Sequence, residues 1–375
     1  FNLKDVVVDG YRFIGWKVFE TSGSWQKDTI YLKNSSGNFT NFSVMWGDVI
    51  LDAQFNLIYT ITLTNTSIID NSSVSNLINL GFVQSEDNYV LEYTVEDTVT
   101  LPGVTSASHD FVNWQLTEIT SEGFSGWING GVYNAGTEIN GYTGSVVLAA
   151  QWNAKQFILT ANLNANDATF DEYDGWTVSG SLAYKTVSYG SAYGNLPTVS
   201  RTGYKLAGWY TLPNDGELVT NATIMTSTSN VTIYAQWEAD SFTLTLNATG
   251  GTIVENNNWN ISNDGSTASK EVTFNTAYGT LPIADYENNT IQIYREGFTF
   301  AGWFSLDGSN NNNWGEEVSS STLLNVAHDV TIYAKWIEYV LTMDANGGQI
   351  YESDNWIVLN NGAIATKSVT YKAEY

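Results

Sequence analysis

Side chains that commonly carry out catalysis are scarce in this sequence. It contains no cysteine and two histidines, His109 and His328. An active site requires several polar groups that converge in one pocket, yet these histidines stand at different positions of the repeat described below. The acidic pairs that begin at Asp171 and Glu316 have the residue types of a glycosidase dyad, but nothing in the sequence brings two such groups together. We therefore predict that the protein is not an enzyme and holds no cofactor.

Composition excludes several classes of partner. The chain carries 39 acidic and 14 basic residues, for a formal net charge of −25, whereas nucleic-acid binding requires a basic surface. The same charge disfavours an anionic membrane surface, and no apolar run reaches the length that spans a bilayer. The charge is best explained by solubility and repulsion between neighbouring molecules. A calcium site is the alternative, but no D-x-D-x-D-G loop is present, so we assign no metal ligands.

The elements that would position any functional residue repeat along the chain. One block reads G-Y-R-F-I-G-W at 10–16, G-Y-K-L-A-G-W at 203–209 and G-F-T-F-A-G-W at 297–303, with a weaker copy at 108–114. A second block reads V-T-I-Y-A-Q-W at 231–237, V-T-I-Y-A-K-W at 330–336, V-V-L-A-A-Q-W at 146–152 and V-I-L-D-A-Q-F at 49–55. Such self-similarity predicts a tandem array of small modules.

Two more blocks complete the repeat. One is F-T-L-T-L-N-A-T-G-G at 242–251, matched by Y-V-L-T-M-D-A-N-G-G at 339–348 and, more loosely, at 157–166 and 57–66. The other is V-S-Y-G-S-A-Y-G-N-L-P at 187–197, matched at 272–282 and in part at 94–102 and 369–375. Apolar and polar residues alternate in these blocks, which is typical of half-buried strands. Gly-Gly and Leu-Pro mark the strand ends.

Local signals refine this prediction. The first glycine of each G-Y-x-F-x-G-W block is expected to adopt a positive φ in a turn. No long window shows a convincing helical period. Residues 220–228 and 286–294 are the candidates for one short helix or turn per repeat.

Tryptophans recur at three positions of the repeat. The first two positions lie within strand blocks, which predicts core packing; their tryptophans are Trp16, Trp114, Trp209 and Trp303, and then Trp152, Trp237 and Trp336. The third position lies in Asn- and Gly-rich segments and holds Trp176, Trp259 and Trp356. We interpret this third set as a clamp on the loop of the module or as contacts between successive modules. Stacking on sugar rings is the alternative.

Together the blocks resemble the Listeria–Bacteroides repeat, the module known from the B-repeat of internalin B. The pattern of that family includes D-A-N-G-G, here at 344–348, R-x-G-Y at 201–204, G-W-Y at 208–210 and Y-A-x-W at 234–237. The resemblance implies a mainly β fold of small β-grasp-like α+β modules, about four of them, head to tail. It also implies a large bacterial surface protein without a catalytic site. Phe55, Asn113 and Ala149 depart from the pattern, where Trp, Gly and Tyr are usual.

The blocks divide the chain into five segments. We call residues 1–55 the N-terminal half-module, because they hold the C-terminal part of a repeat. Residues 56–152, 153–237 and 238–336 are the first, second and third full modules, of which the first is divergent. Residues 337–375 hold the N-terminal part of a repeat and are called the C-terminal half-module.

The two ends of the chain fall at one phase of the repeat, since Tyr375 matches Tyr193 and Phe1 matches Gly194. Three interpretations fit this match. The chain could be one averaged period of a longer fibre, or a product of proteolysis at this loop. Alternatively, residues 337–375 of one copy could complement residues 1–55 of the next by strand pairing. Such head-to-tail contacts build filaments when they do not close into a ring.

The sequence as a whole predicts a non-enzymatic extracellular structural repeat protein. Its roles would be a stalk, an adhesin shaft or a filament subunit at the cell surface, and its partners would be copies of itself. A chain without cysteine is common among extracellular bacterial proteins and unusual among secreted eukaryotic ones. The alternative function is a carbohydrate- or receptor-binding adhesin whose exposed aromatic side chains bind surface glycans or a host receptor.

Overall fold

The computed structural model of the chain describes residues 3, 5–32, 47–254, 258–351 and 356–369. Strands dominate these residues, so the predicted mainly β class and the tandem organisation are confirmed. The chain forms two compact units. One consists of residues 1–159, 186–194 and 222–231, and the other of residues 160–185, 195–221 and 232–375. The matched ends, Phe1 and Tyr375, lie outside the described residues.

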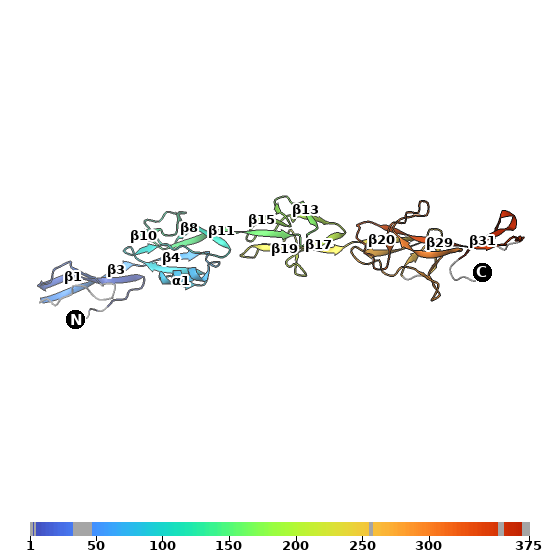
Figure 1. Cartoon of the computed structure of the whole chain (residues 1–375). Coiled ribbons are helices and arrows are strands. Elements are labelled where there is room, and N and C mark those ends of the chain that lie inside the picture. Colours follow the sequence, from blue (N-terminus) through green and yellow to red (C-terminus); the bar gives the residue numbers. More distant parts are fainter. Residues whose placement is uncertain (1–2, 4, 33–46, 255–257, 352–355, 370–375) are drawn as a thin grey trace. The chain divides into compact units, whose positions relative to one another are not determined.

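The N-terminal half-module is a small antiparallel sheet in the strand order β2-β1-β3 (Figure 1). Its strands are β1 (Tyr11–Gly23), β2 (Ile30–Leu32) and β3 (Gly47–Leu57). Val18, Trp25 and Tyr31 form its buried cluster. Most other apolar side chains of β1 and β3 are only partly buried, because no second layer of described residues covers them.

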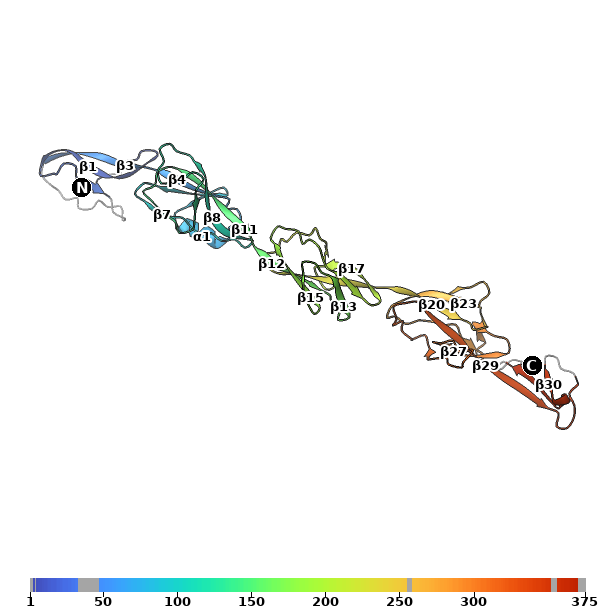
Figure 2. The same cartoon turned by 90° about the horizontal axis from the view of Figure 1, so that it is seen from above.

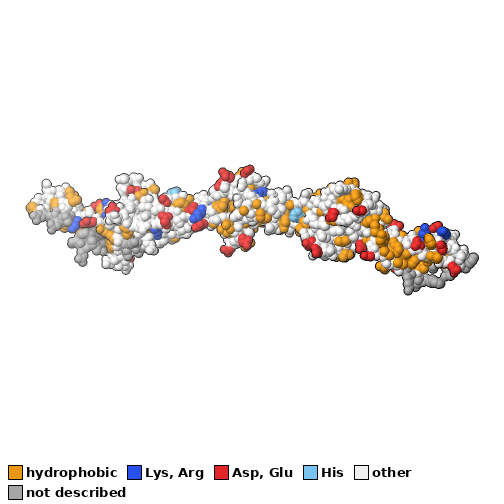
Figure 3. Space-filling model, turned by 180° about the vertical axis from the view of Figure 1, so that it is seen from behind, with side chains coloured by type: hydrophobic (Ala, Val, Ile, Leu, Met, Phe, Trp, Pro, Cys, Tyr) orange, Lys and Arg blue, Asp and Glu red, His pale blue; other side chains and the backbone are white. Residues whose placement is uncertain are grey.

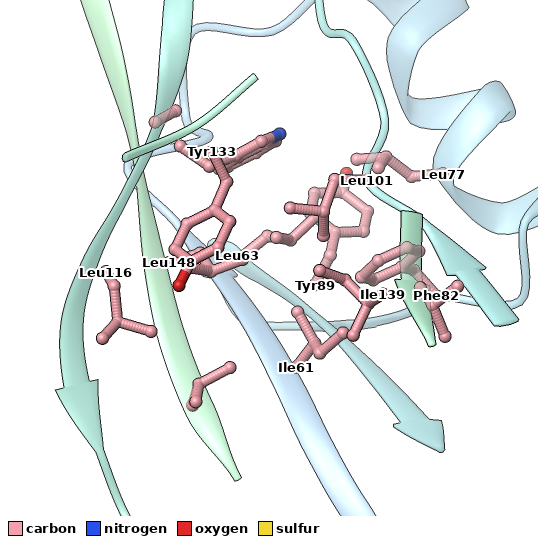
Figure 4. Packing of buried hydrophobic residues seen from close by; sticks show 14 of the residues in the cluster. Ile61, Leu63, Leu77, Phe82, Tyr89, Leu101, Leu116, Tyr133, Ile139 and Leu148 are labelled. Atoms are coloured by element: carbon pink, nitrogen blue, oxygen red, sulfur yellow. The ribbon is translucent and has the colours of Figure 1, made fainter. Parts of the chain in front are cut away.

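The first full module has a mixed sheet in the order β5-β6-β4-β11-β8-β9. These strands are β4 (Tyr59–Thr64), β5 (Val83–Ser85), β6 (Asn88–Tyr93), β8 (His109–Ile119), β9 (Val132–Tyr133) and β11 (Val146–Ala154). A separate pair joins β7 (Thr98–Thr100) to β10 (Glu138–Asn140). Ile61, Leu63 and Leu148 are completely buried in the core between these layers, where Leu101 and Ile139 meet them (Figure 4).

A helix of this module, α1 (Asn71–Asn79), lies where the sequence offered no helical signal. Asp70 caps its N-terminus by accepting a hydrogen bond from the Ser73 amide at 2.9 Å. The predicted helix or turn candidates are different: residues 290–291 and 293–294 belong to short strands, and residues 220–228 form no helix. Neither segment is a helix, but turns occur at residues 221–222 and 286–289, as the prediction of a short helix or turn allowed.

The second full module has one sheet in the order β13-β16-β17-β19-β12-β15-β14, with β18 beside β17. Its strands are β12 (Gln156–Asn162), β13 (Ala168–Glu172), β14 (Thr177–Ser179), β15 (Leu182–Ser188), β16 (Thr198–Arg201), β17 (Tyr204–Tyr210), β18 (Leu218–Val219) and β19 (Val231–Ala239). Ile233 and Ala235 of β19 are completely buried, as the alternation of V-T-I-Y-A-Q-W predicts.

The third full module repeats this plan in the order β22-β23-β20-β29-β27-β28 (Figure 2). Its main strands are β20 (Ser241–Asn247), β22 (Asn260–Ile261), β23 (Thr267–Thr273), β27 (Phe298–Phe304), β28 (Glu317–Val318) and β29 (Val330–Asp344). Two short pairs flank them: β21 (Thr252–Ile253) with β26 (Ile293–Tyr294), and β24 (Ala284–Asp285) with β25 (Thr290–Ile291).

In the first and third full modules, the first and last strands are parallel neighbours at the centre of the sheet. In the third full module β20 runs parallel to β29, with Thr245 beside Thr331. In the first full module β4 runs parallel to β11, with Ile61 beside Val146. Leu244 and Leu246 of β20 are completely buried, because strands cover both edges of β20 and the core covers the face that these side chains share.

The C-terminal half-module begins within β29, whose second part pairs with β31 (Ile364–Val369). The remaining elements are β30 (Ile357–Leu359) and the 3-10 helix η1 (Asn360–Gly362). By block alignment these strands correspond to β20, β23 and β22 of the third full module. The half-module therefore contains the first half of the module plan without the strands that complete it.

Candidate functional site

The residues with catalytic chemistry are scattered. The Nδ1 atom of His109 lies 2.8 Å from the hydroxyl of Ser108, and Nδ1 of His328 lies 2.8 Å from the carbonyl oxygen of Asp329. Asp171 is exposed on β13 and accepts a hydrogen bond from Ser200. Within the described residues, no group of three or more His, Cys, Asp or Glu side chains could hold a metal ion.

The strand tryptophans fasten loops to the sheet through their indole nitrogens. Trp114, Trp209 and Trp303 are buried, and each donates to the carbonyl oxygen of the proline in its own Leu-Pro block, at 2.7, 3.3 and 2.8 Å. The second set is half-buried and donates to the turn that follows the first strand. Those bonds are Trp152 to Asn65 (3.0 Å), Trp237 to Leu163 (2.9 Å) and Trp336 to Ala248 (2.8 Å).

The third tryptophan position is also engaged inside its own module. Trp176 and Trp259 are 7% and 1% exposed. Their indole nitrogens donate to the residue that precedes Leu-Pro, Asn195 at 3.0 Å and Thr280 at 3.2 Å. A lysine ammonium covers each ring, 4.7 Å from the ring centroid of Trp176 and 4.3 Å from that of Trp259. These two residues clamp a loop, and little of either ring is available to a ligand.

The tryptophans of the half-modules are less buried. Trp16 packs edge-on against Phe13 with ring centroids 5.4 Å apart, but both side chains are only half-buried. Trp356 is half-buried too, and its lysine, Lys367, lies 5.9 Å from the ring centroid. Trp16 and Trp356 therefore keep part of their local packing but are less covered than their counterparts in the full modules, and Phe55 replaces the tryptophan of the second position.

A different constellation recurs where one module meets the next. The last strand of a module is separated from the first strand of the following one by a single residue: Lys155 between β11 and β12, and Asp240 between β19 and β20. The Lys155 amide donates backward to Ser108 at 3.0 Å, and its carbonyl accepts from Tyr189 of the next module at 2.8 Å. The linking residue is thus hydrogen-bonded to both modules.

The junction after the second full module has the same geometry with other side chains. The Asp240 amide donates to Gly203 at 2.9 Å, and its carbonyl accepts from the Phe274 amide at 2.7 Å. The Phe274 ring packs edge-on against Tyr204, with centroids 5.5 Å apart. Gly203 has φ +77°, as its position in the block predicts. A Cβ atom there would collide with the Phe274 ring, so this ring can cross the junction only because residue 203 is glycine.

Aromatic packing crosses the preceding junction as well. His109 lies edge-on to Tyr189 with centroids 5.5 Å apart. The ammonium of Lys155 donates to the carbonyl of Ser106 at 2.6 Å. His109 therefore occupies the position of Tyr204, and its ring has a packing partner in the junction.

The first junction keeps the backward bond, since the Ile58 amide between β3 and β4 donates to Gly10 at 3.0 Å, and the two outer junctions have further contacts of their own. At the first, Arg12 of the N-terminal half-module forms an ion pair with Asp97 of the first full module. Burial opposes ionisation of Asp97, but hydrogen bonds from the amide and hydroxyl of Thr94 and the nearby Arg12 outweigh it and lower its pKa. At the last, Glu338 pairs with Phe298 in one module while the next residue, Tyr339, pairs with Val369 in the other.

These junction residues had no individual sequence signal. Lys155 and Asp240 differ in charge, and the bonds that they share go through backbone groups, which every residue type except proline supplies; the bond from the Lys155 ammonium to Ser106 has no counterpart at Asp240. The signal that was present is the short, similar spacing between the A-Q-W block and the following strand block. This short spacing leaves only one residue between the last strand of one module and the first strand of the next. That near-continuity can be recognised only once the bounds of the strands are known.

One groove stands near the third tryptophan position. It lies on the third full module, has a volume of about 520 Å³, and is lined by residues that include Asn260, Lys270, Glu271 and Tyr278. Burial lowers the pKa of Lys270, since the charged ammonium loses water when it packs over Trp259. The wall of the groove therefore presents the polar side chains of Asn260 and Glu271 and the amine of Lys270.

Comparison with known proteins supports the resemblance over part of the chain. Residues 167–236 and 242–335 each match the Listeria–Bacteroides repeat domain. A protein of Evansella cellulosilytica, provisionally described as a Gly-rich membrane protein, is 28% identical over 240 residues, which cover 61% of this chain and 24% of that protein. A second protein of that organism, provisionally described as a membrane protein, is 28% identical over 153 residues, 40% of this chain and 18% of its own length. The chain therefore spans a quarter or less of these relatives.

Proposed function

We propose that this chain is a non-enzymatic structural segment of a bacterial cell-surface protein, in which successive modules act as a stalk or adhesin shaft. Two of its segments match a repeat domain, and two relatives are described as membrane proteins. The described part of the chain has no helix long and apolar enough to span a bilayer. The parallel pairing of first and last strands supports the β-grasp-like arrangement implied by the resemblance. The observation that carries the proposal is the junction residue bonded to both neighbouring modules.

The strand arrangement suits a segment that transmits force. Tension would enter the third full module at the start of β20 and leave it beyond the paired part of β29. Because these strands are parallel neighbours, pulling on these two points slides them past one another. The hydrogen bonds of the ladder then share the load, instead of opening one at a time. The first full module has the same pairing between β4 and β11.

Single-molecule stretching of the whole chain tests this proposal. Each full module should unfold in its own step and release about 30 nm of chain, from the length of an extended residue. The variant Thr245→Pro removes one backbone donor within β20 and should lower the unfolding force of a single step. The other modules serve as internal controls. Extension without discrete steps, or an equal change in every step, would contradict the force-transmitting role.

A carbohydrate-binding adhesin is the competing function. Its most suitable place is the groove beside Trp259 and Lys270, since sugar hydroxyls pair well with polar side chains. A glycan array with the whole chain and the Lys270→Ala variant separates the two functions. The structural role predicts no specific binding by either protein. Binding that disappears in the variant would favour the adhesin.

A further inference from the structure

The third full module has a strand edge that no described strand covers. On this side of β23 the last pair joins Asn260 of β22 to Ser269. On the other side β20 pairs with β23 along its whole length. Residues 270–273, which we call the open edge, therefore have a neighbour on one side only among the described strands. Exposed edges of this kind are templates for pairing with another chain.

The hydrogen bonds at the two ends of β23 show which backbone groups point to the open edge. At its start the Thr267 carbonyl accepts from the Ser262 amide, on the side of β22. Successive residues of an antiparallel strand alternate between its two sides, so every second residue after Thr267 faces the open edge. The Thr273 carbonyl already accepts from the Thr276 amide at 3.1 Å. The groups that remain for a partner are the amide and carbonyl of Glu271 and the amide of Thr273, since no strand of the described residues pairs with them on this side.

The groove of the third full module lies along this open edge. Residues 270–273 contribute to its lining, together with Asn258, Asn260, Thr280 and the segment 276–278. Its volume of about 520 Å³ falls in the range of clefts that hold ligands. The unpaired backbone groups of the open edge therefore face a space that a partner can enter.

One ammonium group at this groove has no acceptor among the described residues. The Nζ atom of Lys270 lies over the Trp259 ring, 4.3 Å from the ring centroid, and burial lowers the pKa of this lysine. The equivalent lysine of the second full module, Lys185, also covers a tryptophan, but its ammonium donates to the Asn195 carbonyl at 2.9 Å. A partly desolvated charge without an acceptor is costly, so an acceptor that a ligand brings to Lys270 would offset that cost.

We propose that the third full module binds an extended peptide segment of another protein along the open edge of β23, with an acidic side chain of that segment against the Lys270 ammonium. Backbone hydrogen bonds to Glu271 and Thr273 supply the pairing, as they do where peptides add to exposed sheet edges. The carboxylate of the partner supplies a charge-assisted hydrogen bond to Lys270. This docking role goes beyond the spacer role and does not depend on it.

A peptide suits this groove better than a sugar does. The open edge offers backbone donors and an acceptor at the spacing of a strand, whereas Trp259 is 1% exposed and offers no face on which a sugar ring could stack. Charge narrows the partner further. Acidic side chains are spread over the face in Figure 3, where lysine and arginine are few, and the net charge is −25. The partner segment is therefore expected to carry basic residues around a single carboxylate, because a strongly acidic segment would be repelled.

Peptide titration of the whole chain tests the proposal. The probes are end-capped peptides of alternating Thr and Val with a Lys at each end, in which a single Glu takes each inner position in turn. At least one of them should bind with a dissociation constant of about 0.1–1 mM, measured by the anisotropy of a dye on the peptide. Replacing its Glu by Gln should weaken binding at least about tenfold, and so should Lys270→Gln in the protein.

Lys185→Gln is the matched control for Lys270→Gln. Because Lys185 is already bonded to Asn195, this variant should leave the dissociation constant unchanged. Absence of binding by every peptide up to about 10 mM, or equal binding by Lys270→Gln and the unmodified chain, would overturn the proposal. Binding of a glycan through Lys270 without binding of any peptide would assign the groove to sugars and would overturn it too.

A proline at residue 271 tests the role of the strand edge. The Glu271 amide points away from β20, so Glu271→Pro removes an edge donor without removing a bond within the sheet. It should weaken peptide binding at least about tenfold, whereas Glu271→Gln should bind at least as tightly as the unmodified chain. Thr186→Pro makes the equivalent change in the second full module and should have no effect on binding. Unchanged binding by Glu271→Pro would overturn the edge pairing.

Hydrogen exchange of the unmodified chain gives a test that needs no proline. The bound peptide should slow exchange of the Glu271 and Thr273 amides, because it supplies the acceptors that they lack. The Lys270 and Val272 amides should exchange slowly with and without peptide, since they face β20. Peptide binding that leaves the exchange of Glu271 and Thr273 unchanged would overturn the proposal.

Discussion

Residues 242–247 in the third full module and residues 339–344 in the C-terminal half-module have closely similar sequences but different surroundings. Leu246 is completely buried between β23 and the parallel strand β29, whereas Met343 at the same position is 39% exposed. The sheet neighbour on one side is equivalent in both regions. The difference therefore arises from the second half of the module: its strand β29 lies beside β20, whereas no equivalent strand of the described residues lies beside residues 339–344.

This difference teaches which interactions hold a module together. The alternation of apolar residues determines which side chains face inward, but burial depends on strands that lie far apart in sequence, such as β20 and β29. Apolar burial contributes roughly 25 cal/mol per Å², so a side chain of the same type stabilises the two regions by different amounts. Equivalent substitutions in the full and half-modules should therefore differ in effect, and the predictions below measure that difference.

The largest effect is expected at the third tryptophan position. Trp259→Ala removes a ring that is 1% exposed, together with its hydrogen bond to Thr280. It should cost about 3–5 kcal/mol of the opening free energy of the third full module. The same change at the half-buried Trp356 should cost about 1 kcal/mol. Hydrogen exchange of amides in each region measures both values. Equal losses would show that burial at this position does not differ between the full module and the half-module.

The conservative variant Trp259→Phe separates the stabilisation that comes from packing of the ring from the stabilisation that comes from the hydrogen bond of the indole N–H. It keeps most of the apolar contact but leaves the Thr280 carbonyl without the indole N–H. The expected loss is about 1–2 kcal/mol, close to that of a buried hydrogen bond. A loss as large as that of Trp259→Ala would mean that the hydrogen bond, and not packing, dominates this position.

Leu246→Ala and Met343→Ala form the next matched pair. The first creates a cavity in a closed core and should destabilise the third full module by about 3 kcal/mol. The second shortens a side chain that already contacts solvent and should change stability by about 0.5 kcal/mol. Exchange rates of β20 and β29 amides report the two outcomes. Similar costs would show that the half-module has a closed core of its own.

Gly203→Ala tests the junction between the second and third full modules. The new Cβ would collide with the Phe274 ring and would also hold alanine at φ +77°. Together these should cost about 2–3 kcal/mol and speed exchange of the Phe274 amide. Gly175→Ala is the control, since it has φ +78° but nothing within 4 Å of the added atom. Should the two variants cost the same, backbone strain alone would explain the result.

The smallest effect concerns the ion pair at the first junction. The pKa of Asp97 is lowered in the folded chain, so its stabilising effect is present above the ordinary aspartate pKa of about 4 and is lost as the pH falls below that value. Both side chains are partly exposed, so Asp97→Asn should cost at most about 1 kcal/mol at pH 7. The cost should shrink as the pH falls below about 4, because protonation of the carboxyl removes the charge that Arg12 and Thr94 stabilise.

Exchange of β1 amides between pH 7 and pH 2 measures the contribution of Asp97. Asp70→Asn is the matched control, because hydrogen bonds from Thr105, Ser72 and Ser73 lower the pKa of Asp70 too, but this residue caps α1. Its acid sensitivity should appear in the helix and not in β1. A β1 response that is the same in wild type and Asp97→Asn would contradict the assignment.

The sequence predicted the strands whose side chains alternate and the glycine turn at residue 203. It also placed Trp209 and Trp303 in strand blocks, and both are buried. It did not predict α1, because that helix is rich in Asn and Ser and its cap, Asp70, also accepts a hydrogen bond from Thr105, far away in sequence. It did not predict the junction contacts either, since the bonds common to Lys155 and Asp240 go through backbone groups that carry no residue-type signal.

Amide hydrogen exchange of the dilute, unmodified chain tests the central claim most directly. In residues 242–247, strands lie on both sides, so every amide should be protected. In residues 339–344 only β31 is a neighbour among the described strands; alternate amides should therefore be protected, while those between them exchange quickly. Continuous protection of residues 339–344 at high dilution would contradict the account.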